Sequence, residues 1–126
     1  MAIDYAVKKL RKNSSHDKSV LVIEEAFIKA NGIDNKRIKL LEIEQNDINS
    51  EEIFHVYNNM KRRQMLVETV YPFKSKSGVN INLEFVDFDE KMISAKKKAA
   101  NYLYKKSKKL LSQYNSSQLN QVENNK

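Results

Sequence analysis

The chain is poor in the residues that mark several common kinds of functional site. It has no cysteine, which excludes disulfides and thiolate metal sites and is typical of a reducing compartment. Its two histidines, His16 and His55, lie far apart in the sequence, so the usual ligands form neither a Cys/His nucleophile pair nor a closed metal site. Its two glycines, Gly32 and Gly78, cannot form a phosphate-cradling loop. These absences predict a protein that is not an enzyme and that uses no metal or cofactor.

Long apolar runs are also missing. No run approaches the roughly 18 apolar residues that cross a bilayer, and the first residues lack the charged and apolar regions of a signal peptide. We therefore expect a cytoplasmic protein that does not associate with membranes. A length of 126 residues predicts one domain with a modest core. We expect that domain to cover residues 1–114, followed by a disordered tail over 115–126 that is rich in Ser, Asn and Gln.

Positive charge is abundant and unevenly placed. The formal net charge is +7, and eight lysines without any acid lie between Lys91 and Leu111. Between Asp34 and Glu52, in contrast, six acids face three basic residues. The chain is therefore polarised. Its basic part suits a polyanion such as DNA, and its acidic side is expected to face away from that partner or toward a protein partner.

The first half of the chain predicts helices. Ile3, Ala6, Val7 and Leu10 recur at the spacing of a short amphipathic helix, and a second helix is expected around Asp17 to Asn31, with Gly32 ending it. Residues 36–44 fit either a short buried strand or a helical turn, of which we favour the helix.

The middle of the chain predicts one more helix and then a hairpin. Ser50 is placed to cap a helix that runs to Gln64, with acids in its first turn. The period then changes to two, which predicts strands over Leu66–Phe73 and Val79–Phe85. Pro72 limits the first strand to a sheet edge or a strand end. Lys74 to Gly78 form the expected turn.

A long C-terminal helix is expected over residues 89–114. At about 100° per residue, most of its lysines fall opposite an apolar face. That face is long for packing on one small domain, so we expect part of it to pair with a second copy. The expected contacts of this homodimer are Met92, Ala99, Leu103 and Leu110.

This order of elements resembles the winged-helix DNA-binding proteins that dimerise through their last helix, such as the bacterial replication terminator proteins and the PadR-type and SarA-type regulators. The resemblance covers roughly Asp17 to Leu111 and lies in the pattern of elements. It implies an α+β, mainly helical, winged helix-turn-helix fold with a two-stranded wing and a long C-terminal helix. Ser50–Gln64 would match the recognition helix, Lys74–Gly78 the wing and Asp89–Leu111 the dimer helix.

Such a layout implies contacts with double-stranded DNA from polar and basic side chains on the recognition helix and the wing. The candidate DNA-binding residues are His55, Asn58, Asn59, Lys61, Arg62, Arg63, Lys74 and Lys76. The competing interpretation is that Lys61 to Arg63 are simply a solvated helix end, where cations suit the helix dipole.

Two functions follow from these patterns. The first is a dimeric, sequence-preferring DNA-binding protein: a transcriptional regulator, or a replication or transfer accessory factor of a bacterial chromosome, plasmid or phage. The second is a small phage or mobile-element interaction or inhibitor protein, which docks its basic helix on a host protein or ribonucleoprotein machine.

Overall fold

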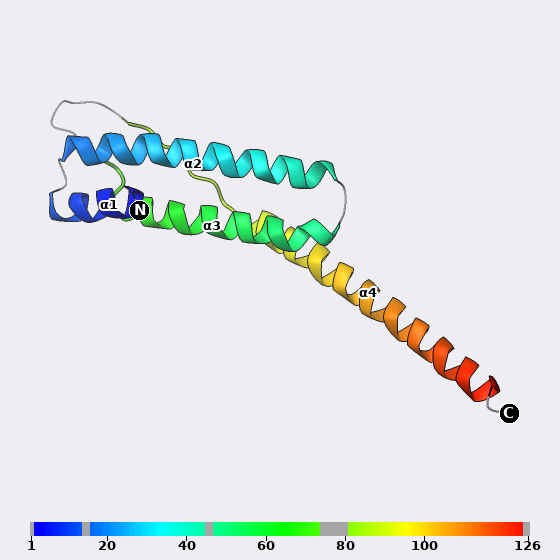
Figure 1. The fold of residues 1–126 in the computed structure, drawn as a ribbon. Coiled ribbons are helices and arrows are strands. Elements are labelled where there is room, and N and C mark those ends of the chain that lie inside the picture. The colour runs from blue at the N-terminus through cyan, green and yellow to red at the C-terminus, as the bar shows by residue number, and fades with distance from the viewer. Residues whose placement is uncertain (1, 14–15, 45–46, 74–80, 125–126) are drawn as a thin grey trace.

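The computed structural model describes residues 2–13, 16–44, 47–73 and 81–124 and shows a helical bundle from which the last helix projects (Figure 1). Its elements are α1 (Ala2–Lys12), α2 (Asp17–Ile43), the 3-10 helix η1 (Asp47–Asn49), α3 (Ser50–Glu68) and α4 (Asp89–Asn124). The long helix α2 packs against both α1 and α3, and α4 packs against α3 and η1. The free part of α4 leaves the bundle at the end where α2 finishes and α3 begins.

The predicted α+β winged helix is wrong, because the described part of the chain is mainly helical and contains no strand. Helix α3 continues to Glu68, so the strand expected over Leu66–Phe73 does not form. Val67 is fully buried on this helix, where its spacing from Met60 and Gln64 also fits a helical face. The expected wing turn, Lys74 to Gly78, lies outside the described residues, as do Val79 and Asn80.

The described part of the second expected strand, residues 81–85, has no regular secondary structure. Its burial nevertheless alternates: Ile81 and Leu83 are buried, whereas Asn82 and Glu84 are exposed. The period of two thus correctly indicated a segment with one buried face. The buried side chains pack against helices instead of lying in a hairpin.

The core consists of two apolar clusters along the bundle, and α2 contributes to both. The first contains Ala6, Val7, Leu10, Val20, Ile23, Phe27, Val67, Ile81 and Leu83. The second contains Ile38, Val56, Tyr57, Met60 and Phe88, with Ile53 and Met92 packed against it. The second cluster joins α2, α3 and the start of α4, and therefore positions the helix that projects.

Several predictions for the first half are confirmed, and one is wrong. Helix α1 forms as expected and buries Ala6, Val7 and Leu10. Residues 36–43 are helical, but as a continuation of α2, because Gly32 does not end that helix. Phe27 and Ile38 on either side of Gly32 are both buried, so packing holds α2 as one helix across the glycine.

We expect Gly32→Ala to stabilise the protein by about 0.5–1 kcal/mol, because alanine restricts the unfolded chain and favours a helix interior. A Cβ atom at this position meets nothing within 4 Å, so the substitution adds no clash. Urea unfolding of the variant and the wild type measures the difference. A loss of stability would contradict the continuous helix, since alanine is unfavourable in the left-handed conformation of a helix-ending glycine.

Candidate nucleic-acid interface

The predicted recognition helix exists as α3, but it starts differently from the expectation. Asn49 occupies the cap position and makes no side-chain hydrogen bond to the first turn; its Nδ2 atom donates to Glu44 Oε2 at 2.7 Å instead. Ser50 is the first residue of the helix and is buried. The prediction that Ser50 caps the helix is therefore wrong by one position, although the helix itself is confirmed.

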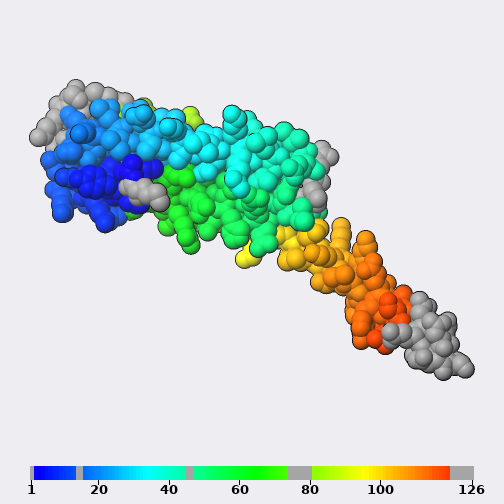
Figure 2. Space-filling model, in the orientation of Figure 1, coloured from blue at the N-terminus to red at the C-terminus, as the bar shows by residue number. Residues whose placement is uncertain are grey.

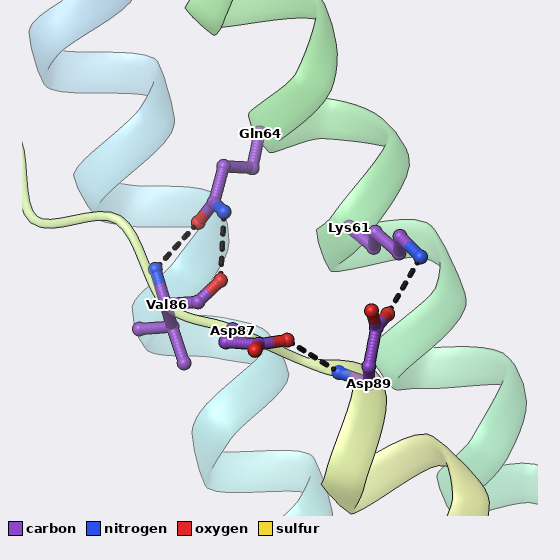
Figure 3. A network of polar contacts seen from close by, with 5 residues as sticks. All are labelled: Lys61, Gln64, Val86, Asp87 and Asp89. Carbon is purple, nitrogen blue, oxygen red and sulfur yellow. Dashed lines mark hydrogen bonds and ion pairs between the residues drawn. The ribbon is translucent and has the colours of Figure 1, made fainter.

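The basic triplet of α3 does not form one surface. Lys61 Nζ lies 2.7 Å from Asp89 Oδ1, which joins α3 to the first residue of α4 (Figure 3). The hydrogen bond to Asp89 raises the pKa of Lys61, and the charge of that carboxylate adds to the effect. This lysine therefore remains protonated at neutral pH and acts as a link between two helices.

Arg63 faces a different helix from Lys61. Its Nη2 atom lies 2.8 Å from Asp34 Oδ2, and Nη1 donates to Asn31 Oδ1 at 2.9 Å. The side chains of Arg63 and Asp34 are each only 20% exposed, so this pair is shielded from water. Arg63 thereby holds α3 against α2 and is poorly placed for an external anion.

Gln64 joins α3 to the segment that precedes α4 (Figure 3). Its Nε2 atom donates to the backbone oxygen of Val86 at 2.8 Å, and its Oε1 atom accepts from the backbone N–H of Val86 at 2.9 Å. Gln64 is buried, and both ends of its amide are used. The side chain therefore makes the paired contacts that a neighbouring strand would otherwise provide.

Four of the remaining predicted DNA-binding residues lie on α3, and the other two lie outside the described residues. His55, Asn59 and Arg62 are exposed, and Asn58 is half-buried. At about 100° per residue these four side chains share one side of α3. His55 Nε2 lies 3.9 Å from Glu51 Oε1, and both side chains face solvent. The two wing lysines, Lys74 and Lys76, lie outside the described residues, so the structure does not bring the expected recognition helix and wing together.

Helix α4 carries the largest basic surface of the described chain, and it has three distinct sides. At about 100° per residue, the side that meets the bundle includes Met92 and Ala95. Met92 is half-buried and Ala95 is buried. A second side is apolar and exposed. The third, which we call the lysine face, spans about 120°. The lysine face consists of Lys91, Lys97, Lys98, Lys105, Lys108 and Lys109.

Most of the lysine face is available for an external partner. Lys97, Lys98, Lys105, Lys108 and Lys109 are exposed, and none forms an ion pair with a described residue. Lys91 is the exception, because its ammonium lies 5.8 Å from the centre of the Tyr57 ring. The sequence predicted that these lysines share one face of the helix, but they were not among the predicted DNA-binding residues. Their spacing on one side of a helix without acids is the feature that could have identified them.

The four predicted dimer contacts differ in how exposed they are. Met92 packs against the second core cluster and Ala99 is half-buried, whereas Leu103 and Leu110 are 55% and 57% exposed. The helix continues to Asn124 and so extends past Tyr114, where the ordered part was expected to end. Beyond the bundle, α4 forms an arm that is visible in Figure 2 as the orange and red extension.

A cleft of about 600 Å³ lies where η1, α3 and the base of α4 meet. Its lining includes Leu41, Ile53 and Tyr57 together with the acids Glu42 and Asp47. Burial raises the pKa of Tyr57, and the charge of Glu42 raises it further, so the phenol stays protonated at neutral pH.

The described part of the chain lacks two further features. No group of three or more histidine or carboxylate side chains there is arranged to hold a metal ion. Likewise, no helix there combines the length and the apolar character needed to cross a bilayer.

We expect Arg63→Met to lower the free energy of unfolding by about 1–3 kcal/mol, because it leaves Asp34 without its cation in a shielded position. Arg62→Met is the matched control, since Arg62 is exposed on the same helix. Denaturant unfolding of both variants measures the difference. Equal effects of the two substitutions would contradict a specific link between α3 and α2.

We expect Gln64→Met to cost about 1–2 kcal/mol, because a side chain of similar length removes both hydrogen bonds to Val86. Gln113→Met, which changes an exposed glutamine of the arm, should leave stability within about 0.5 kcal/mol of the wild type. Thermal and urea unfolding compare the two variants. A neutral Gln64→Met would show that water replaces the amide at no cost.

Comparisons with known proteins give no relative for this chain: no family model, no curated protein and no solved structure matches it. The resemblance to winged-helix regulators therefore gains no support from them. The features of the described residues that bear on function are their charges and exposed faces, above all the lysine face of α4.

Proposed function

We propose that the protein binds double-stranded DNA through the lysine face of α4, with contacts mainly to phosphates. The observation that carries this proposal is the set of exposed lysines on a projecting helix with no acid from Lys91 to Val122. A lysine ammonium is a compact point charge that suits phosphate contacts of variable geometry. The proposed site therefore moves from α3, where Lys61 and Arg63 have internal partners, to α4.

Duplex DNA fits this surface better than duplex RNA does. An α-helix with its side chains is about 10–12 Å across, and the major groove of B-DNA is about 12 Å wide. The deep, narrow major groove of A-form RNA does not admit side chains in this way. Helix α4 has 36 residues, so it is about 54 Å long and can follow several phosphates.

The proposed binding depends less on DNA sequence than the predicted winged-helix contacts would. Base edges are commonly read by arginine and asparagine side chains, and α4 places no arginine on its lysine face. The remaining candidates for base contacts are the exposed Asn101, which at about 100° per residue lies among the lysines of this face, and the exposed Asn59 and Arg62 of α3. Action as an accessory DNA-binding factor in the cytoplasm of a bacterium is part of the proposal.

Duplex binding in rising salt tests the proposal. If about six phosphates are neutralised, log affinity falls with log salt at a slope of roughly −5. The triple variant Lys98→Gln/Lys105→Gln/Lys109→Gln removes one line of the lysine face and should make the slope about three units shallower. Fluorescence anisotropy with a labelled random duplex measures both quantities.

The matched control is Lys18→Gln/Lys29→Gln/Lys39→Gln, which removes three exposed lysines from α2 and gives the same net charge. We expect the control to change the slope by less than about one unit. Equal effects of the two triple variants would reduce the binding to a consequence of net charge. No duplex binding even at low salt would overturn the proposal and favour docking of the basic helix on a host protein or ribonucleoprotein machine.

A further inference from the structure

Helix α4 carries an apolar stripe, from its base into the arm, that nothing in the described chain covers. Its six large side chains are each more than half exposed, and they lie within about 120° of the helix circumference. They are Ile93 at 54%, Leu103 at 55%, Tyr104 at 67%, Leu110 at 57%, Leu111 at 60% and Tyr114 at 61%. One exposed lysine, Lys96, lies within the same arc near the base of the helix, with its ammonium 5.7 Å from the centre of the Phe54 ring. The lysine face occupies a different arc, so a partner on one side leaves the other side free.

The bundle cannot cover this stripe by a small adjustment. Met92 and Ala95 show which side of α4 meets the bundle, and the stripe is centred roughly 100° away from that side. Ile93 is exposed even at the base of the helix, where α4 is in contact with α3. Farther out, the arm extends beyond the bundle altogether, as Figure 2 shows.

The exposed area is close to what a stable dimer requires. Each of the six side chains exposes on the order of 100 Å², which gives roughly 600–700 Å² for one copy. A standard interface buries about 800 Å² on each partner. The largest apolar patch of an ordinary monomer is typically about 300–600 Å², so this stripe is large for a surface that stays in water.

We propose that the stripe pairs with the same stripe of a second copy, with the two α4 helices antiparallel. Read in the opposite direction about a midpoint between Leu103 and Tyr104, the stripe matches itself at its centre and at its two ends. Leu110 and Leu111 then lie level with the partner's Lys97 and the partner's Lys96, and the methylene stems of lysines pack on apolar surface while their ammonium groups stay in water. Ile93 of one copy then lies opposite the partner's Tyr114, and Leu103 lies opposite the partner's Tyr104. The small Ala100 meets the partner's Ser107, which allows the two helices to approach closely.

Charge selects this orientation over a parallel one. In a parallel pair, the dense lysine segment 105–109 of one copy lies level with the same segment of the other. The antiparallel register sets it beside residues 98–102 of the partner, which contain one lysine. It also places the two bundles at opposite ends, which reduces the repulsion between two chains of net charge +7.

Sedimentation equilibrium of the full chain tests the pairing. We expect the affinity of the dimer to increase as salt rises, because salt screens the repulsion between two positive chains. The affinity of the chain for an acidic partner would instead decrease as salt rises, because salt screens their attraction. Leu103→Asp/Leu110→Asp should weaken dimerisation on the order of 100-fold. Both leucines are exposed, so circular dichroism should show that the variant keeps its helices.

Ser112→Asp adds an acid on the side of the arm away from the stripe and is the matched control, with dimerisation expected to change less than about threefold. A wild-type chain that remains a monomer at several hundred micromolar would overturn the proposal. If that monomer still binds DNA, the function proposed above stands, so the two failures are distinguishable. Salt-resistant binding of the monomer to neutral phospholipid vesicles would assign the stripe to a lipid surface instead.

The absence of cysteine from the chain allows a direct test of orientation. Under mild oxidation, Ile93→Cys mixed with Tyr114→Cys should give the mixed disulfide in preference to either self-linked pair, because these positions face each other only in the antiparallel register. Efficient self-linking of each variant alone would show a parallel pair and overturn the orientation.

Discussion

One side-chain amide helps the second core cluster to position α4. Gln64 pairs with both backbone groups of Val86, and this fixes an extended segment to α3 at a point between the two core clusters. Leu83 before this point enters the first cluster, and Phe88 after it enters the second. Asp87 then accepts a hydrogen bond from the backbone N–H of Asp89, where α4 begins (Figure 3). The direction of the projecting helix therefore follows from a contact made well before its exposed surface starts.

The sequence predicted where helices form better than it predicted which elements pack against one another. The amphipathic spacing of α1 and the starts of α3 and α4 identified helices that the structure contains. The alternation over 81–85 correctly predicted which side chains are buried. It could not show what covers them, because a period of two indicates an extended segment with one apolar face and does not specify a second strand. Tertiary packing against α2 and α3 decided that question.

The same limit explains why the predicted site was divided. Lys61, Arg62 and Arg63 are adjacent in sequence, but consecutive residues of a helix point about 100° apart and do not face one another. They consequently meet α4, solvent and α2 in turn. Lysines seven residues apart, such as Lys91, Lys98 and Lys105, instead share one side of a helix. Spacing was therefore the better guide to a basic surface than local density of charge.

The anchored base of α4 also determines how the arm remains helical. Starting a helix is costly, and isolated helices shorter than about 12–15 residues are marginal in water. Here the first turns of α4 are held by Phe88, Met92 and the link from Lys61 to Asp89. The arm therefore extends a helix whose first turns the bundle already stabilises. Its outer turns add to this helix without the cost of starting a new one. A body of modest size thus supports a long exposed helix whose local sequence, rich in lysine and asparagine, contributes little packing of its own.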